Sequence, residues 1–218
     1  MRKHFDEYFA KIVLEYCFPE RYRDLAVRDK PDLQGKNVGI EVTNCTPKNV
    51  REGFALCRKV VRAGERAARR DIERIEQLKD VQITPSAIVW DQGFYSNDLT
   101  RSPLNTFLNA VEKKLEKLNR TTAKYADFEH YDLFVNSALD LADSTETWKM
   151  LPQLSFRISQ LNIQARKFEF VYLATINQSI AVFDLNQRYA YIKHLYNRLN
   201  YMAEIARDLW NGAKDEQT

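Results

Sequence analysis

The sequence predicts a mixed α/β domain in which helices pack on a central β-sheet. Several segments carry apolar residues at helical spacing, and short runs rich in β-branched and aromatic residues separate them. No repeat, linker or low-complexity tract divides the 218 residues. The chain is therefore expected to form a single domain over residues 1–218, with a polar tail at 211–218.

The predicted order is helix, hairpin, helix, strand, helix, strand, helix, two strands, helix. The first helix, at 4–17, places Phe5, Phe9, Ile12, Val13 and Tyr16 on one stripe. The hairpin has strands near 30–33 and 38–43. The other helices are expected at 49–79, 103–120, 144–161 and 186–210. The other strands are expected within 83–91, at 131–137 and in a pair that turns at Asn177-Gln178.

The composition is typical of a soluble globular protein, with 44% hydrophobic and 29% charged residues. No run approaches the roughly 20 apolar residues that a membrane span needs, and the N-terminus lacks the features of a signal peptide. The three cysteines form no CxxC pair, and an odd number argues against a disulfide framework. A reducing cytoplasm is the expected location.

The net charge of +3 does not by itself indicate a nucleic-acid-binding protein. Residues 51–80 contain nine Lys and Arg against six Asp and Glu, and arginines recur at every fourth position from Arg58 to Arg74. This stripe is either a solvated helix face with internal ion pairs or a surface that contacts phosphates. The charge pattern leaves both interpretations open.

Two carboxylates in the predicted hairpin need an explanation. Glu41 lies in an apolar strand, where side-chain alternation places it opposite the buried face formed by Val38, Ile40 and Val42. A two-residue turn at Gly35-Lys36 would set Asp32 opposite Gly39 and diagonal to Glu41, with the glycine leaving open space between them.

Such a pair of carboxylates requires a compensating charge. At a separation of about 4 Å they repel by about 4 kcal/mol at an effective dielectric constant of about 20. A shared proton or a bridging cation relieves this repulsion. An all-oxygen site suits Mg²⁺ or Mn²⁺ rather than zinc. The alternative is a Pro-Asp turn followed by a strand whose polar face contacts only water.

The segment resembles the PD-(D/E)XK nuclease superfamily, which has the restriction-endonuclease-like fold. Pro31-Asp32 matches the first half of the motif and Glu41-Val42-Thr43 the second, with Thr43 in the place of the usual lysine. The resemblance implies that Asp32, Glu41 and the Val42 carbonyl hold Mg²⁺ or Mn²⁺, and that an acidic residue of the first helix, here Glu15, joins the site. The family core would cover about residues 4–90, elaborated by 91–210.

The departure at Thr43 allows three explanations: a lysine comes from another element, the metal works without it, or the domain is no longer catalytic. A threonine offers a hydrogen bond but no charge. Lys114 is the first candidate for a migrated lysine, because it flanks the apolar stripe of the helix at 103–120. Lys36 in the turn is the second.

The function expected from the resemblance is metal-dependent hydrolysis of phosphodiester bonds, in DNA rather than RNA. A homodimer is an option, because restriction-like enzymes often cut two strands as dimers. The first alternative is an inactive nuclease-like domain that binds nucleic acid or a protein. The second is an α/β interaction protein without any nuclease site.

Overall fold

A computed structural model describes residues 4–46, 48–63, 69–78, 82–84, 87–89, 103–120, 124–137, 145–175, 179–196 and 198–215. The chain divides into two compact units, one comprising Met1–Asn44 with Phe107–Thr218 and the other Cys45–Thr106. The assignment of a single domain over the whole chain stays a prediction.

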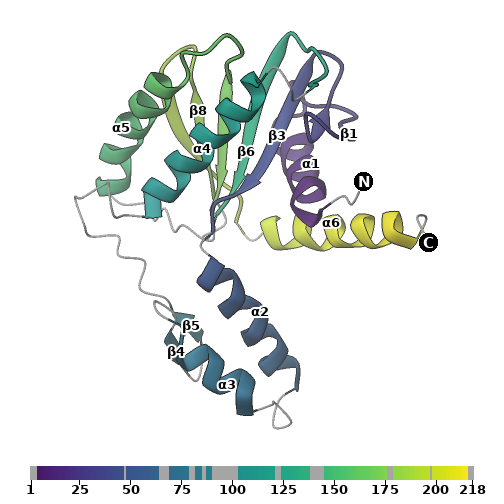
Figure 1. Cartoon of the computed structure of the whole chain (residues 1–218), viewed down its shortest axis with the longest axis vertical. Coiled ribbons are helices and arrows are strands. Elements are labelled where there is room, and N and C mark those ends of the chain that lie inside the picture. The colour runs from purple at the N-terminus through teal and green to yellow at the C-terminus, as the bar shows by residue number, and fades with distance from the viewer. Residues whose placement is uncertain are drawn as a thin grey trace. The chain divides into compact units, whose positions relative to one another are not determined.

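The larger unit contains a seven-stranded mixed sheet (Figure 1). Its strands β3, β6 and β7 run parallel to one another, and every other neighbouring pair is antiparallel. The order across the sheet is β1 (Ala26–Val27), β2 (Leu33–Gln34), β3 (Val38–Asn44), β6 (His130–Asn136), β7 (Phe170–Ala174), β8 (Ser179–Asp184) and β9 (Tyr189–His194).

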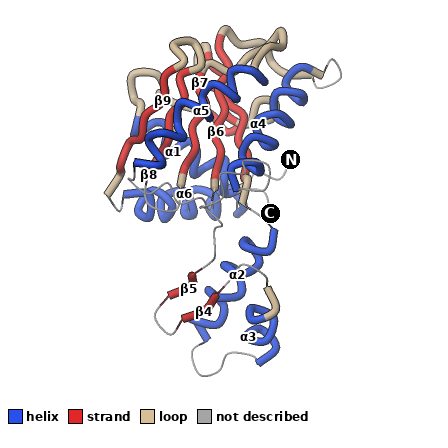
Figure 2. Tube along the Cα trace, turned by 90° about the vertical axis from the view of Figure 1, so that its left-hand side faces the viewer, coloured by secondary structure: helices blue, strands red, loops and turns tan. Residues whose placement is uncertain are grey.

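Helices cover both faces of this sheet (Figures 1 and 2). On one face, α1 (Phe5–Cys17) and α6 (Arg198–Asp215) share a core cluster with Ile40, Val42 and Phe134. On the other lie α4 (Pro103–Asn119) and α5 (Thr145–Leu161), and the Phe107 ring of α4 lies 5.8 Å from that of Phe183. The predicted class, a mixed α/β fold with helices on a central sheet, is confirmed. No helix of the described residues is long and apolar enough to cross a membrane.

The buried face predicted for the outgoing strand of the hairpin is also confirmed. Val38, Ile40 and Val42 are 6%, 0% and 7% exposed. Gly39 and Glu41 are buried as well, because β3 is an inner strand with helices on both sides. The side chain of Glu41 is 0% exposed.

The final helix begins later than predicted. Residues 189–194 form β9, which pairs antiparallel with β8, and α6 starts only at Arg198. Tyr189 and Tyr191 stack on one face of β9, with ring centroids 5.8 Å apart. Aromatic residues two positions apart favour a strand, whereas the helical pattern begins only with the residues of α6.

The smaller unit contains α2 (Lys48–Ala63), α3 (Arg69–Glu76), β4 (Gln82–Thr84) and β5 (Ala87–Val89). The single helix predicted at 49–79 is wrong, because Arg74 Nε lies 2.6 Å from Glu52 Oε1. A straight helix would separate these residues by about 33 Å. The arginine stripe is thus divided between two helices, and Arg66 lies outside the described residues. The strand predicted within 83–91 is a separate β4–β5 hairpin.

Candidate active site

The β2–β3 hairpin brings Asp32 and Glu41 directly opposite each other. Leu33 pairs with Ile40 and Gln34 with Gly39, so the same register places Asp32 across from Glu41. The Gly35 amide donates to the Val38 carbonyl at 2.8 Å, which makes Lys36 and Asn37 the turn residues. The predicted turn was one residue too early. That error moved the expected partner of Asp32 by two positions, because the strands run in opposite directions.

Gly39 serves a different purpose from the one predicted. A Cβ atom at this position would lie 2.5 Å from Pro31 Cγ and 2.8 Å from Phe128 Cδ2. The surface of the glycine is therefore covered by two rings and is not open. Its missing side chain allows Pro31, and with it the adjacent Asp32, to approach β3 closely.

Lys114 of α4 joins the two carboxylates. Its Nζ donates to Glu41 Oε2 at 2.5 Å and to Asp32 Oδ2 at 3.1 Å. The side chains of Lys114 and Asp32 are each 14% exposed, and the Val42 amide also donates to Asp32 Oδ2, at 2.7 Å. Residues from a loop, a strand and a helix thus converge around one buried ion-pair cluster.

The position of Lys114 follows from how α4 packs. Phe107, Val111 and Leu115 are buried, and Lys114 lies beside Val111 and Leu115 on the helix, so its long side chain can run along the interface to the sheet. Burial alone would lower the pKa of this amine, but Glu41 and then Asp32 outweigh that effect and raise the pKa. Lys114 is therefore a charged ammonium at neutral pH.

Two further residues that the sequence did not single out lie beside Glu41. Lys117, one turn after Lys114, places Nζ 3.5 Å from Glu41 Oε2 and 5.9 Å from the centre of the Tyr125 ring. Burial and then the negative charge of Glu41 raise the pKa of the Tyr125 hydroxyl, which remains neutral. Within the described part of the chain, Glu41 Oε1 and the Tyr125 hydroxyl are buried without a hydrogen-bond partner.

Glu15 makes its hydrogen bonds outside the cluster of Asp32, Glu41 and Lys114. Its Oε1 accepts from Lys11 Nζ and from the Leu25 amide, each at 2.7 Å, which ties α1 to the segment before β1. Its membership of the site stays a prediction that these contacts do not favour.

Glu7, two turns earlier on α1, is the carboxylate of this helix that interacts electrostatically with Asp32 and Lys114. It is 7% exposed. Burial raises the pKa of Glu7, and the hydrogen bond from the His4 amide opposes this rise. The charge of Asp32 raises this pKa further, and the charge of Lys114 lowers it. The helical period places both Glu7 and Glu15 at the border of the apolar stripe of α1, so it indicates both residues as candidates. Only the packing of the helix on the sheet distinguishes them.

The remaining predicted residues lie close by. Thr43 is partly buried, two positions after Glu41 on the same side of β3. Lys36 is exposed in the β2–β3 turn. Val42 contributes its amide to the site, and the role of its carbonyl as a ligand stays a prediction.

Two residues of the site offer the oxygen ligands that a hard divalent cation prefers, although the Lys114 ammonium already bonds one oxygen of each. Asp32 and Glu41 supply carboxylate oxygens, and Glu41 Oε1 is buried near the Tyr125 hydroxyl, whose pKa Glu41 raises. Among the described residues, no three His, Cys, Asp or Glu side chains are grouped as metal ligands. An ion here would be held by two carboxylates and complete its shell with water, as Mg²⁺ commonly does.

No protein-family model, curated protein or solved structure matches this chain. The chemistry of the site is therefore inferred from its own residues and geometry.

The buried carboxyl of Glu7 leads to a pH-dependent prediction. Its pKa in the folded protein is raised above the usual 4.5, so ionisation at neutral pH costs folding free energy that is absent below that value. Glu7→Gln should raise the melting temperature at pH 7, and the difference should vanish as the pH falls below about 4.5. Glutamine keeps an oxygen for the bond from the His4 amide. Melting curves of both proteins between pH 4 and 8 test this, and an equal difference at every pH would contradict it.

Proposed function

We propose that the protein is a Mg²⁺- or Mn²⁺-dependent nuclease that hydrolyses phosphodiester bonds, with DNA as the preferred substrate. The observation that carries the proposal is the convergence of Asp32, Glu41 and Lys114 from separate elements. A lysine beside two carboxylates supplies the charge that Thr43 lacks.

The topology supports a restriction-endonuclease-like core, although its limits differ from those expected. The order helix, strands, helix, strand corresponds to α1, β1–β3, α4 and β6, and β6 lies parallel beside β3. In this interpretation the core is formed by residues 4–44 and 107–136. The unit at Cys45–Thr106 is then an insertion in the chain between β3 and α4.

The residues have distinct roles in the proposed reaction. Asp32 and Glu41, with the Val42 carbonyl, would hold the metal, which supplies activation of a water molecule and compensation of charge on the phosphate. Lys114 orients the attacking water or holds a phosphate oxygen, because its ammonium is charged and lies beside both carboxylates. Lys117 adds a second positive charge next to Glu41. Glu7, buried on α1, lies near enough for Asp32 and Lys114 to affect its pKa.

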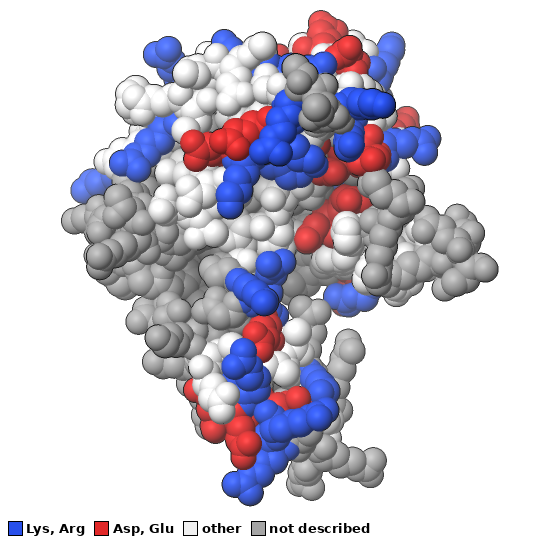
Figure 3. Space-filling view, viewed as in Figure 1, with Lys and Arg blue, Asp and Glu red and all other residues white. Residues whose placement is uncertain are grey.

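The surface charge is compatible with local phosphate contacts. Figure 3 shows Lys and Arg side chains interspersed with Asp and Glu on the face that carries α4. This mixed pattern favours a few positioned contacts over a long uniformly positive groove. A homodimer that cuts both strands stays a prediction.

The same ion-pair cluster also supports the alternative, an inactive nuclease-like domain that binds nucleic acid or a protein. Lys114 already places a cation between the carboxylates, so the site is charge-compensated without a metal ion. A domain that had lost catalysis could keep these residues as a buried structural cluster.

A nuclease assay separates the two functions. Purified protein is incubated with supercoiled, linear and single-stranded DNA and with RNA, each with Mn²⁺, Mg²⁺ or excess chelator. Cleavage of DNA that needs the metal supports the nuclease. Binding without cleavage under every condition supports the inactive domain, and preferential cleavage of RNA would overturn the choice of substrate.

Metal binding should be visible as a change in stability. Mg²⁺ or Mn²⁺ should raise the melting temperature, because an ion that binds only the folded state stabilises it by mass action; the gain is about 2.7 kcal/mol at 100 times the dissociation constant. Asp32→Asn should reduce that response, because it removes one charged ligand. Asp29→Asn, in the exposed loop before Pro31, is the matched control. Identical responses of wild type and Asp32→Asn to millimolar metal would contradict the two-carboxylate site.

A further inference from the structure

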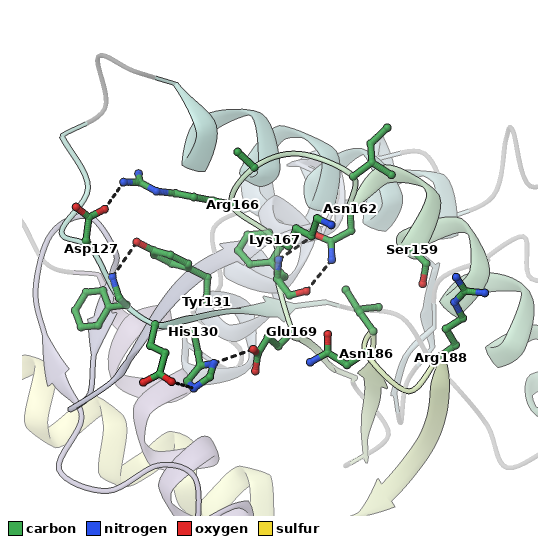
Figure 4. Close-up of a pocket in the computed structure, with 16 residues that line it drawn as sticks. Asp127, His130, Tyr131, Ser159, Asn162, Arg166, Lys167, Glu169, Asn186 and Arg188 are labelled. Carbon is green, nitrogen blue, oxygen red and sulfur yellow. Dashed lines mark hydrogen bonds and ion pairs between the residues drawn. The ribbon is translucent and has the colours of Figure 1, made fainter.

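A second site lies in the larger unit, apart from the Asp32, Glu41 and Lys114 cluster. It is a pocket of about 780 Å³ lined by three segments, at 127–131, 159–169 and 185–188 (Figure 4). None of the three residues of the proposed active site lines it. Its volume falls within the range of about 300–1,000 Å³ that is typical of small-molecule sites.

The loop after α5 is held in place by two asparagines. The Asn162 side chain donates to the Phe168 carbonyl at 2.7 Å and accepts from the Phe168 amide at 2.9 Å. The Asn119 side chain makes the same pair of bonds with the backbone of Arg166, at 2.9 and 2.8 Å. Lys167 lies between these two anchored residues, so its backbone position is set before any ligand arrives.

The β8–β9 turn on the pocket wall is also fixed by a side chain. Asp184 Oδ1 accepts from the amides of Asn186 and Gln187 at 3.0 and 2.9 Å. Arg188 follows with φ of 54°, a left-handed conformation that is uncommon for a residue with a long side chain. Pre-organised loops reduce the ordering cost of binding, and they are common carriers of functional residues.

The charges of the pocket are unevenly compensated. Asp127 pairs with Arg166, and Glu169 pairs with Arg21, which Asp132 shares. Glu129 and Glu169 also contact His130, whose imidazole compensates them only when it is protonated. Lys167 and Arg188 line the same pocket and have no carboxylate within ion-pair distance in the described part of the chain. An incoming anion can therefore pair with Lys167 and Arg188, which no carboxylate of the described residues contacts at ion-pair distance.

We propose that this pocket binds a small phosphate ester of about the size of a mononucleotide, with Lys167 and Arg188 holding its phosphate. A phosphate matches the planar donor fork of an arginine and the point charge of a lysine. Figure 4 shows Ser159, Asn186 and Arg188 together on one side of the pocket, where hydroxyl and amide groups add neutral hydrogen-bonding capacity. The volume exceeds what an inorganic phosphate fills, which favours an ester with an organic group.

Calorimetric titration of the full chain with 5′-AMP, adenosine, inorganic phosphate and a ten-nucleotide single-stranded DNA tests the proposal. AMP should bind more tightly than inorganic phosphate, and adenosine should bind far more weakly than AMP. Lys167→Ala and Arg188→Asn should each weaken AMP binding by on the order of tenfold or more, since each removes a charged hydrogen bond. Asparagine tolerates the left-handed backbone at 188.

Arg157→Ala is the matched control, because Arg157 is exposed on α5 and does not line the pocket. It should bind AMP like wild type. Equal affinity for AMP and adenosine, or unchanged affinity in both pocket variants, would overturn the proposal. Binding of the oligonucleotide alone would also overturn it, since the positive charges would then belong to a nucleic-acid surface. The outcome does not depend on nuclease activity, so either proposal can fail without the other.

Discussion

Glu41→Ala should abolish metal-dependent cleavage of DNA, with a loss on the order of 10³-fold or more. Compensation of transition-state charge by a metal ion amounts to several kcal/mol, and each 1.36 kcal/mol corresponds to a tenfold change in rate. Glu41 is the fully buried carboxylate of the cluster and contacts both Lys114 and Lys117. Its removal takes away a metal ligand and releases both lysines from their partner.

Lys114→Ala should have a smaller effect on cleavage, on the order of 10²-fold, because it removes a charge that orients water or phosphate and leaves both carboxylates in place. Lys113→Ala and Glu116→Ala, exposed neighbours on α4, are the matched controls and should cut like wild type. The measurement is the initial rate of supercoiled-DNA cleavage with Mn²⁺. Cutting that persists undiminished in Glu41→Ala would place the activity at another site.

The sequence predicted three of the residues that converge, Asp32, Glu41 and Lys114, but not the register that brings them together. Strand alternation showed that Glu41 lies opposite the face of Val38 and Ile40, and the apolar stripe of α4 left Lys114 on its flank. The exact partner of Asp32 depended on one turn residue, and no local pattern distinguishes a turn at Lys36-Asn37 from one at Gly35-Lys36.

The residues that were missed belong to packing between distant elements. Tyr125 lies in an irregular segment before β6, and it comes near Glu41 through the pairing of β6 with β3 and the bond from the Ala126 amide to the Lys30 carbonyl. Glu7 and Glu15 share one stripe of α1, so the choice between them depends on how the helix sits on the sheet. The order of strands, with β6 beside β3, likewise required a pairing across more than 80 residues of intervening chain.

Lys114→Met should destabilise the metal-free protein by about 3 kcal/mol, the lower end of the cost of breaking a buried ion pair. Methionine preserves the unbranched side chain, so the change removes the charge while keeping most of the packing. Glu41 would keep only Lys117, whose side chain is 43% exposed and 3.5 Å away. The expected fall in melting temperature is roughly 6–12 °C for a unit of this size.

The metal response of this variant tests whether Lys114 and the cation serve the same carboxylates. If they do, Mg²⁺ or Mn²⁺ should raise the melting temperature of Lys114→Met more than that of wild type, because the ion then relieves a repulsion that the lysine no longer compensates. Lys113→Met should melt within about 1–2 °C of wild type with or without metal, as expected for an exposed position. Adding Glu41→Gln to Lys114→Met should recover stability, because a neutral amide does not repel Asp32. The double variant should also lose the extra metal response, because the amide does not replace a charged metal ligand. A double variant that stays as unstable as Lys114→Met would show that lost packing, and not unpaired charge, causes the effect.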